Sequence, residues 1–140
     1  MNRSEPGCTS PPRDGVTVGV DIIEVEKITR LLTRWGDSFL SRCFTTDEAQ
    51  RARGRPETLA GYIAAKEAFA KAAGRGLRGF GWRDVEVRAG STGRPSLRLH
   101  RGAAQIAERQ GWRSVSLSLT HAAGVAVAVV AALTTQDIKD

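Results

Sequence analysis

Residues 56–74 have the sequence PETLAGYIAAKEAFAKAAG, the longest regular segment of the chain. Proline suits the first turn of a helix, because its missing N–H needs no partner there, and glycine suits the position after the last turn. Between these ends, apolar side chains recur every three to four residues. The segment therefore predicts a long helix with one apolar face, made by Leu59, Tyr62, Ile63, Phe69, Ala70 and Ala73.

Charged residues interrupt this apolar face. Lys66 projects into its middle, Glu67 lies at its margin, and Lys71 follows one turn later. Two interpretations are open. In the first, Lys66 extends its ammonium group to solvent along apolar surface, and Glu67 and Lys71 form a surface ion pair. In the second, the three charges serve a ligand.

The segments before the long helix predict a strand and two helices. Residues 16–21, VTVGVD, are rich in β-branched residues and predict a strand that ends at Asp21. Residues 23–35 have helical spacing, and Gly36 ends that helix. The sequence TTDE at 45–48 has the form of a capping box and predicts the start of a short helix.

The segments after the long helix are mainly strands. Residues 84–88 and 95–99 predict two strands joined by a glycine-containing turn. An amphipathic helix is expected over 101–110. Residues 114–120 and 124–132 predict a half-buried and a buried strand that pair with each other. We therefore expect an α+β fold, with a mainly antiparallel sheet packed against the long helix.

The chain of 140 residues suits one domain, expected over 16–134, with an N-terminal extension at 1–15 and a tail at 135–140. Three of the five prolines lie in the extension, which favours disorder there. The longest apolar run is about ten residues, roughly half of a membrane span, so we expect a cytoplasmic protein. Two cysteines, Cys8 and Cys43, are too few for a disulfide framework or a zinc site.

The net charge is +6, which makes an anionic partner plausible: a nucleic acid, a phosphorylated small molecule or an acidic protein. A nucleic-acid-binding module is one alternative, because a basic chain with an Ala/Lys-rich helix is similar to double-stranded RNA-binding domains. Those domains place that helix after their strands, however, whereas here it precedes four of the five predicted strands.

Asp21 and Glu67 are candidate metal ligands. Two carboxylates from separate segments are the oxygen ligands that Mg²⁺ takes when phosphate oxygens and water complete its shell. The simpler alternative for Asp21 is that it caps the following helix. His121, at the end of the predicted strand 114–120, is one of two histidines, and its simplest role is packing or surface exposure.

Several short motifs together resemble one protein family. They are GVDIIEVEKI, CFTTDE, LAGYIAAKEAFAKAAGRG, DVEV, TGRP and VSLSLTH, in this order along the chain. The chain resembles the holo-acyl carrier protein synthases, the small bacterial class of 4′-phosphopantetheinyl transferases, from about residue 16 to 132. The resemblance implies transfer of 4′-phosphopantetheine from coenzyme A to a serine of an apo-acyl carrier protein, with release of adenosine 3′,5′-bisphosphate.

The resemblance also implies roles for individual residues. Asp21 and Glu67 would bind Mg²⁺. Glu67 is the catalytic candidate, although the sequence does not decide between it and a metal-bound water as the base. The residues implied to contact coenzyme A are Lys66 and Lys71 at its phosphates, Gly93, Arg94 and Pro95 in a turn at its adenosine end, and His121 near its 3′-phosphate.

Partners follow from the resemblance as well. The acidic carrier, of fatty acid or polyketide synthesis, is expected to bind Lys27, Arg30 and Arg34 on the first helix. A homotrimer with sites between its subunits is expected. Tyr62 and Lys27 stand where the family commonly has arginine, and at position 62 this removes a possible phosphate contact. A further alternative is that the chain is a family member that has lost its activity and serves only as an interaction subunit. The retained site residues argue against this alternative.

Overall fold

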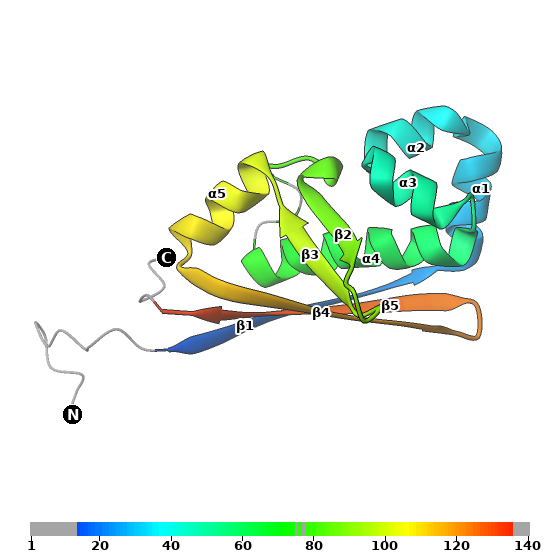
Figure 1. Ribbon diagram of the computed structural model, residues 1–140. Coiled ribbons are helices and arrows are strands. Elements are labelled where there is room, and N and C mark those ends of the chain that lie inside the picture. Colours follow the sequence, from blue (N-terminus) through cyan, green and yellow to red (C-terminus); the bar gives the residue numbers. More distant parts are fainter. Residues whose placement is uncertain (1–13, 75, 77, 136–140) are drawn as a thin grey trace, which may run out of the picture.

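A three-stranded antiparallel sheet covers one side of the long helix α4 (Pro56–Ala73) (Figure 1). The computed structural model describes residues 14–74, 76 and 78–135. The strands are β1 (Gly15–Glu24), β5 (Val125–Thr134) and β4 (Trp112–Ala122), in that spatial order. The α+β fold, with its antiparallel sheet against the long helix, is confirmed.

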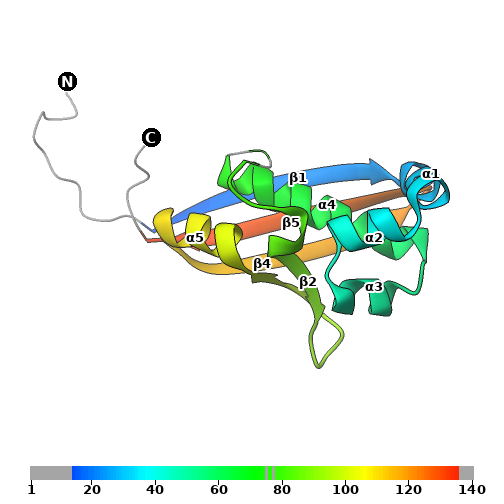
Figure 2. The same cartoon turned by 90° about the horizontal axis from the view of Figure 1, so that it is seen from above.

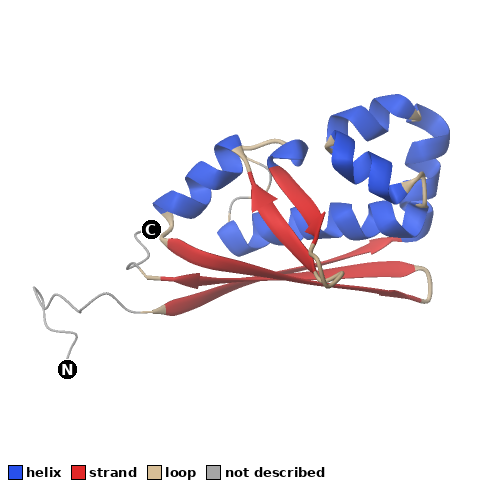
Figure 3. Cartoon of the chain, viewed as in Figure 1, coloured by secondary structure: helices blue, strands red, loops and turns tan. Residues whose placement is uncertain are grey.

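The other side of α4 is covered by a second layer. This layer consists of α1 (Val25–Trp35), α2 (Asp37–Cys43), α3 (Thr46–Ala52), η1 (Trp82–Asp84), the hairpin of β2 (Val85–Ala89) and β3 (Pro95–Leu99), and α5 (Arg101–Arg109). The helices α1 to α3 lie at one end of α4, the hairpin crosses its middle, and α5 lies toward the other end (Figures 1 and 3). Because α4 is enclosed by both layers, it is buried on nearly every side rather than along one face.

A glycine sets how closely β1 approaches α4. A Cβ atom at Gly19 would lie 2.0 Å from the carbonyl oxygen of Ala68 and 2.5 Å from the amide nitrogen of Ala72. The hydroxyl of Thr17 donates a 2.7 Å hydrogen bond to the carbonyl oxygen of Ala72. Only glycine allows this contact between the two backbones, and alternate residues of β1 therefore face α4 at short range.

Two strands extend beyond their predicted ends, and one helix was not predicted. β1 continues through Glu24, so Asp21 lies inside the strand, opposite Ala128 of β5, and does not cap a helix. Helix α2 was not predicted. β4 continues to Ala122, so His121 is a strand residue, and the predicted pairing of β4 with β5 is confirmed.

The predicted N-terminal extension, except for 14–15, and the tail residues 136–140 lie outside the described residues. Among the helices that the structure describes, none is long and apolar enough to span a bilayer.

A buried ion pair joins α4 to the second layer. The ammonium group of Lys66 is fully buried and donates to both carboxylate oxygens of Glu48, at 2.9 and 3.0 Å. It also donates to the carbonyl oxygens of Trp82, at 3.0 Å, and Val85. Glu48 is equally buried and accepts hydrogen bonds from the backbone N–H groups of Thr45 and Val87.

This geometry corrects the interpretation of Lys66. Its ammonium group neither reaches solvent nor has a free N–H for a phosphate, because buried acceptors surround it. Burial lowers the pKa of the Lys66 ammonium, and the charge of Glu48 opposes that change. The prediction that Lys66 contacts coenzyme A does not fit this position, and we leave Lys66 out of the proposed site.

Replacing Gly19 with alanine tests the contact between β1 and α4. The added Cβ meets backbone atoms, which cannot move aside cheaply, so we expect Gly19→Ala to lower the free energy of unfolding by about 3 kcal/mol or more. Gly61→Ala is the matched control. Its Cβ would meet only the Cδ1 atom of Leu119, at 3.9 Å, and alanine favours the helix. Urea unfolding measures the free energy of unfolding of both variants. Equal stability of the two would contradict a close backbone contact between β1 and α4 at Gly19.

The buried ion pair predicts strong coupling between its members. We expect Lys66→Met or Glu48→Gln alone to cost about 3–5 kcal/mol, because each leaves a buried group without its partner. The double variant should lose clearly less than the sum of the two single losses. Additive losses in urea unfolding would show that the two side chains do not depend on each other.

Candidate functional site

Asp21 and Glu67 lie side by side where β1 packs on α4. Asp21 is 8% exposed, and its Oδ1 atom accepts a 3.1 Å hydrogen bond from the Nζ atom of Lys71. Burial and then the negative charge of the adjacent Asp21 raise the pKa of Glu67, while Lys27 and Lys71 oppose this. Two carboxyl groups thus share one small region with two ammonium groups around them.

The pair has the donors that a divalent cation requires. The Oδ2 atom of Asp21 is buried and has no hydrogen-bond partner among the described residues. Leaving a carboxylate oxygen in this state is costly unless a ligand satisfies it. Asp21 and Glu67 offer hard oxygen atoms, which suit Mg²⁺. Within the described chain, no group of three or more His, Cys, Asp or Glu residues is placed to hold a metal, so further ligands would come from substrate and water.

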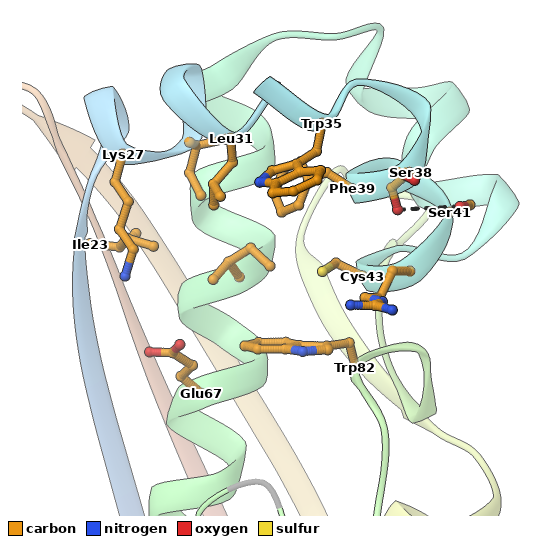
Figure 4. A pocket seen from close by; sticks show the side chains of 13 residues that line it. Ile23, Lys27, Leu31, Trp35, Ser38, Phe39, Ser41, Cys43, Glu67 and Trp82 are labelled. Carbon is orange, nitrogen blue, oxygen red and sulfur yellow. Dashed lines mark hydrogen bonds between the residues drawn. The ribbon is translucent and has the colours of Figure 1, made fainter. Parts of the chain in front are cut away.

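A cavity of about 560 Å³ lies beside Glu67, between α4, η1 and the helices α1 and α2 (Figure 4). Lys27 extends from α1 toward Glu67 at one side of the cavity, and the indole ring of Trp82 lies beside Glu67. The rest of the wall is mainly apolar, with contributions from Ile23, Ile28, Leu31, Trp35, Phe39 and Ile63. We call this space the apolar cavity. It has one charged side and an apolar body.

The predicted basic residues of α1 divide into two groups. Lys27 lines the apolar cavity next to Glu67. Arg30 and Arg34 face solvent. Arg30 pairs with Glu26 at 3.1 Å, and the guanidinium of Arg34 lies 5.1 Å from the ring centre of Trp35. Lys71, with a side chain 58% exposed, reaches solvent from its contact with Asp21.

The predicted nucleotide-binding turn lies elsewhere. Gly93, with φ of +83°, and Arg94 form the tip of the β2–β3 hairpin together with Gly90, whose N–H donates to the carbonyl oxygen of Arg94 at 2.9 Å. Figure 2 shows this tip projecting past β4, the edge strand opposite β1. His121 is exposed on β4. Neither the turn, which includes Pro95, nor His121 lines the apolar cavity of its own chain.

Sequence reasoning missed part of this site. The wall formed by Phe39 and Cys43 belongs to α2, for which the only signal is the helical spacing of Phe39, Leu40 and Cys43 in a seven-residue element. Trp82 gave no local signal. Burial raises the pKa of the Cys43 thiol, although nearby Lys66 and Arg42 oppose this, so Cys43 is a wall residue rather than a nucleophile.

The outer face of the three-stranded sheet is bare; it is apolar along β1 and β5, whereas β4 exposes Ser116, Ser118 and Thr120. All described helices lie on the other side (Figure 3). The outward residues of β1 are exposed to an unusual extent for apolar side chains: Val16 65%, Val18 57%, Val20 52% and Ile22 64%. Contiguous exposed apolar surface of this kind is typical of an interface.

Comparisons with known proteins agree with the fold. The holo-[acyl-carrier-protein] synthase of Herpetosiphon aurantiacus is 43% identical over 122 residues, which cover 82% of this chain and 96% of that protein. The solved synthase of Neisseria meningitidis has a TM-score of 0.76 and 34% identity, covering 83% of this chain and 96% of its own. The solved synthase of Helicobacter pylori, in complex with coenzyme A, has a TM-score of 0.75 and 27% identity, and the match covers 82% of this chain and 98% of that chain.

The family assignment rests on most of the chain rather than on one motif. Residues 17–130 match the 4′-phosphopantetheinyl transferase superfamily, and this range includes both Asp21 and Glu67. The family predicted from the motifs is confirmed. The chain belongs to the 4′-phosphopantetheinyl transferase superfamily and, within it, to the holo-[acyl-carrier-protein] synthases.

Proposed function

We propose that this protein transfers 4′-phosphopantetheine from coenzyme A to a serine of an apo-acyl carrier protein and releases adenosine 3′,5′-bisphosphate. The observation that carries the proposal is the pair of the buried Asp21, with an unsatisfied carboxylate oxygen, and the half-buried Glu67 beside an apolar cavity. The relatives named above are holo-[acyl-carrier-protein] synthases, and one is solved in complex with coenzyme A, which supports both substrates.

Asp21 and Glu67 fit a Mg²⁺ ion by donor type and by the buried oxygen that lacks a partner. When bound, this ion would neutralise charge on the pyrophosphate while the phosphoanhydride bond breaks. Lys71 already donates to Asp21 and is half exposed, so its ammonium group can also contact a phosphate oxygen. Lys27, which faces Glu67, adds a second positive charge at the same side of the cavity.

The transfer requires a base. The serine oxygen forms a bond to the phosphorus that carries pantetheine, and the bond from that phosphorus to the bridging oxygen breaks. The proton of the serine hydroxyl must leave as this happens. We assign it to Glu67, because its carboxylate lies beside Asp21 at the charged side of the apolar cavity and can accept a proton when ionised.

The apolar cavity fits the pantetheine arm. This arm has an apolar dimethyl group, two amides and a thiol end. The cavity has about 560 Å³ and an apolar wall that begins directly at Glu67, with Ser38, Ser41 and Arg42 as polar groups. The exposed Arg30 and Arg34 of α1 lie near the rim formed by Trp35 and supply charge for an acidic carrier.

We further propose a homotrimer with sites between its subunits. In one chain, the hairpin turn of Gly93, Arg94 and Pro95 projects at the β4 edge, whereas Asp21 lies on β1 at the opposite edge (Figure 2). One coenzyme A molecule can use both only if they come from different chains. The bare apolar face of β1 offers the surface through which such chains would associate.

Removing either carboxylate should stop the reaction. We expect Asp21→Asn and Glu67→Gln to reduce carrier modification by about a hundredfold or more at saturating Mg²⁺. The readout is the mass of the carrier after incubation with coenzyme A, and circular dichroism checks the fold. Glu108→Gln, at an exposed position of α5, is the control and should be fully active. A folded Glu67→Gln protein with wild-type activity would refute the assignment.

A charge on the outer sheet face should separate the subunits. We expect Val18→Glu to convert the trimer into monomers and to abolish activity, because a carboxylate would be buried at the interface. Gln105→Glu adds the same charge at an exposed position of α5. It should leave the oligomeric state and the activity unchanged. Light scattering measures the oligomeric state. A trimeric Val18→Glu protein, or a fully active monomer, would contradict the proposal.

A further inference from the structure

The two carboxylate oxygens of Asp21 are in different states. The Oδ1 atom accepts a hydrogen bond from the ammonium group of Lys71, at 3.1 Å, whereas the buried Oδ2 atom has no partner among the described residues. Within the described chain, Lys71 is the only side chain that forms an ion pair with Asp21. A cation that belongs to the protein itself therefore already occupies one side of this carboxylate.

The charges around the pair of carboxylates balance. Lys71 pairs with Asp21, and Lys27 extends from α1 toward Glu67 (Figure 4). Burial raises the pKa of Glu67, and the charges of Lys27 and Lys71 oppose this rise, so both ammonium groups act electrostatically on Glu67. With all four groups ionised, their charges sum to zero. The protein by itself therefore offers a divalent cation little net attraction at this place.

The number of protein ligands is also too small for tight binding of a cation. Mg²⁺ takes about six oxygen ligands, and Mn²⁺ accepts the same kind of site. In the part of the chain that the structure describes, no group of three or more His, Cys, Asp or Glu residues is placed to hold a metal. A cation at Asp21 and Glu67 would thus have two protein carboxylates as ligands and two ammonium groups as neighbours.

Lys71 is free to exchange its acceptor. Its side chain is 58% exposed, and an ion pair at such a position contributes little to stability, so it breaks at low cost. Lys66 on the same helix is the opposite case, because Glu48 and two backbone carbonyl oxygens hold its fully buried ammonium group. A pyrophosphate supplies what Lys71 and the cation both need, since each of its phosphate groups carries a negative charge and oxygen acceptors.

We propose that Lys71 is the counter-ion of Asp21 in the free protein and moves to a phosphate oxygen when coenzyme A binds, so that the divalent cation and coenzyme A bind cooperatively. This inference rests on the proposed function, since it takes coenzyme A as the donor and Asp21 and Glu67 as metal ligands. Lys71 then has two successive partners. It neutralises Asp21 until the cation replaces it there, and it neutralises the pyrophosphate afterwards.

The affinity for Mn²⁺, measured by electron paramagnetic resonance of the unbound ion, tests this exchange. We expect coenzyme A to raise the affinity of the unmodified protein for Mn²⁺ about tenfold or more, after the binding of Mn²⁺ to coenzyme A alone is subtracted. Lys71→Met should bind Mn²⁺ about fivefold more tightly than the unmodified protein in the absence of coenzyme A, because a repelling charge has gone. Its gain on adding coenzyme A should be clearly smaller.

Three further variants make the result specific. Lys71→Arg keeps the charge and should keep the weak binding of Mn²⁺ without coenzyme A. Arg109→Met removes a positive charge at an exposed position of α5 and should behave like the unmodified protein. Asp21→Asn should lose Mn²⁺ binding with and without coenzyme A. If Lys71→Met binds Mn²⁺ alone no better than the unmodified protein, or if coenzyme A leaves the affinity of the unmodified protein unchanged, the proposal is wrong.

This test needs no carrier and no transfer, so it is independent of the proposed reaction. Adenosine 3′,5′-bisphosphate has no pyrophosphate and should not raise the affinity for Mn²⁺. Because coupling is reciprocal, calorimetry should find that Mg²⁺ tightens coenzyme A binding by a similar factor. The mass of the carrier is measured separately. A protein that modifies the carrier without this coupling contradicts the inference alone, whereas coupling without modification supports the inference and contradicts the proposed transfer.

Discussion

The close contact between β1 and α4 determines where the two carboxylates of the proposed site, Asp21 and Glu67, lie. The absence of a side chain at Gly19 allows β1 to approach the backbone of α4. Two residues further along the same face of β1, Asp21 is pressed against α4 next to Glu67. The two carboxylates would not lie beside each other if the strand lay farther away. The unsatisfied oxygen of Asp21 is a consequence of this packing, and a bound cation would compensate for it.

The second layer depends on a different buried interaction. Lys66 and Glu48 connect α4 to α3 and to the start of β2, and the backbone groups of Thr45, Trp82 and Val87 complete their hydrogen bonds. Because Lys66 and Glu67 are consecutive, they point to different sides of α4. One holds the second layer in place, while the other faces the apolar cavity. The same helix thus carries a charge that stabilises the fold on one side and a charge of the proposed site on another.

The sequence predicted the fold to a large extent and the site in part. The helix of α4, its end at Gly74, the capping box at Thr45 and the β4–β5 hairpin all follow from local patterns and are confirmed. Helix α2 was missed, since seven residues carry too weak a periodic signal. The end of β1 was misplaced because pairing with β5, which extends the strand to Glu24, is a contact between distant segments.

By itself the sequence determined most of the segments that form helices and strands, the glycines at which helices end, and the family that the chain resembles. These features depend on residues close together in the chain. Only the tertiary structure decided that Lys66 pairs with Glu48, that Lys27 faces Glu67 and that Lys71 donates to Asp21. Each of these contacts joins side chains from different elements. The partner of a charged side chain depends on how the elements pack, and a pattern within one segment carries no information about that packing.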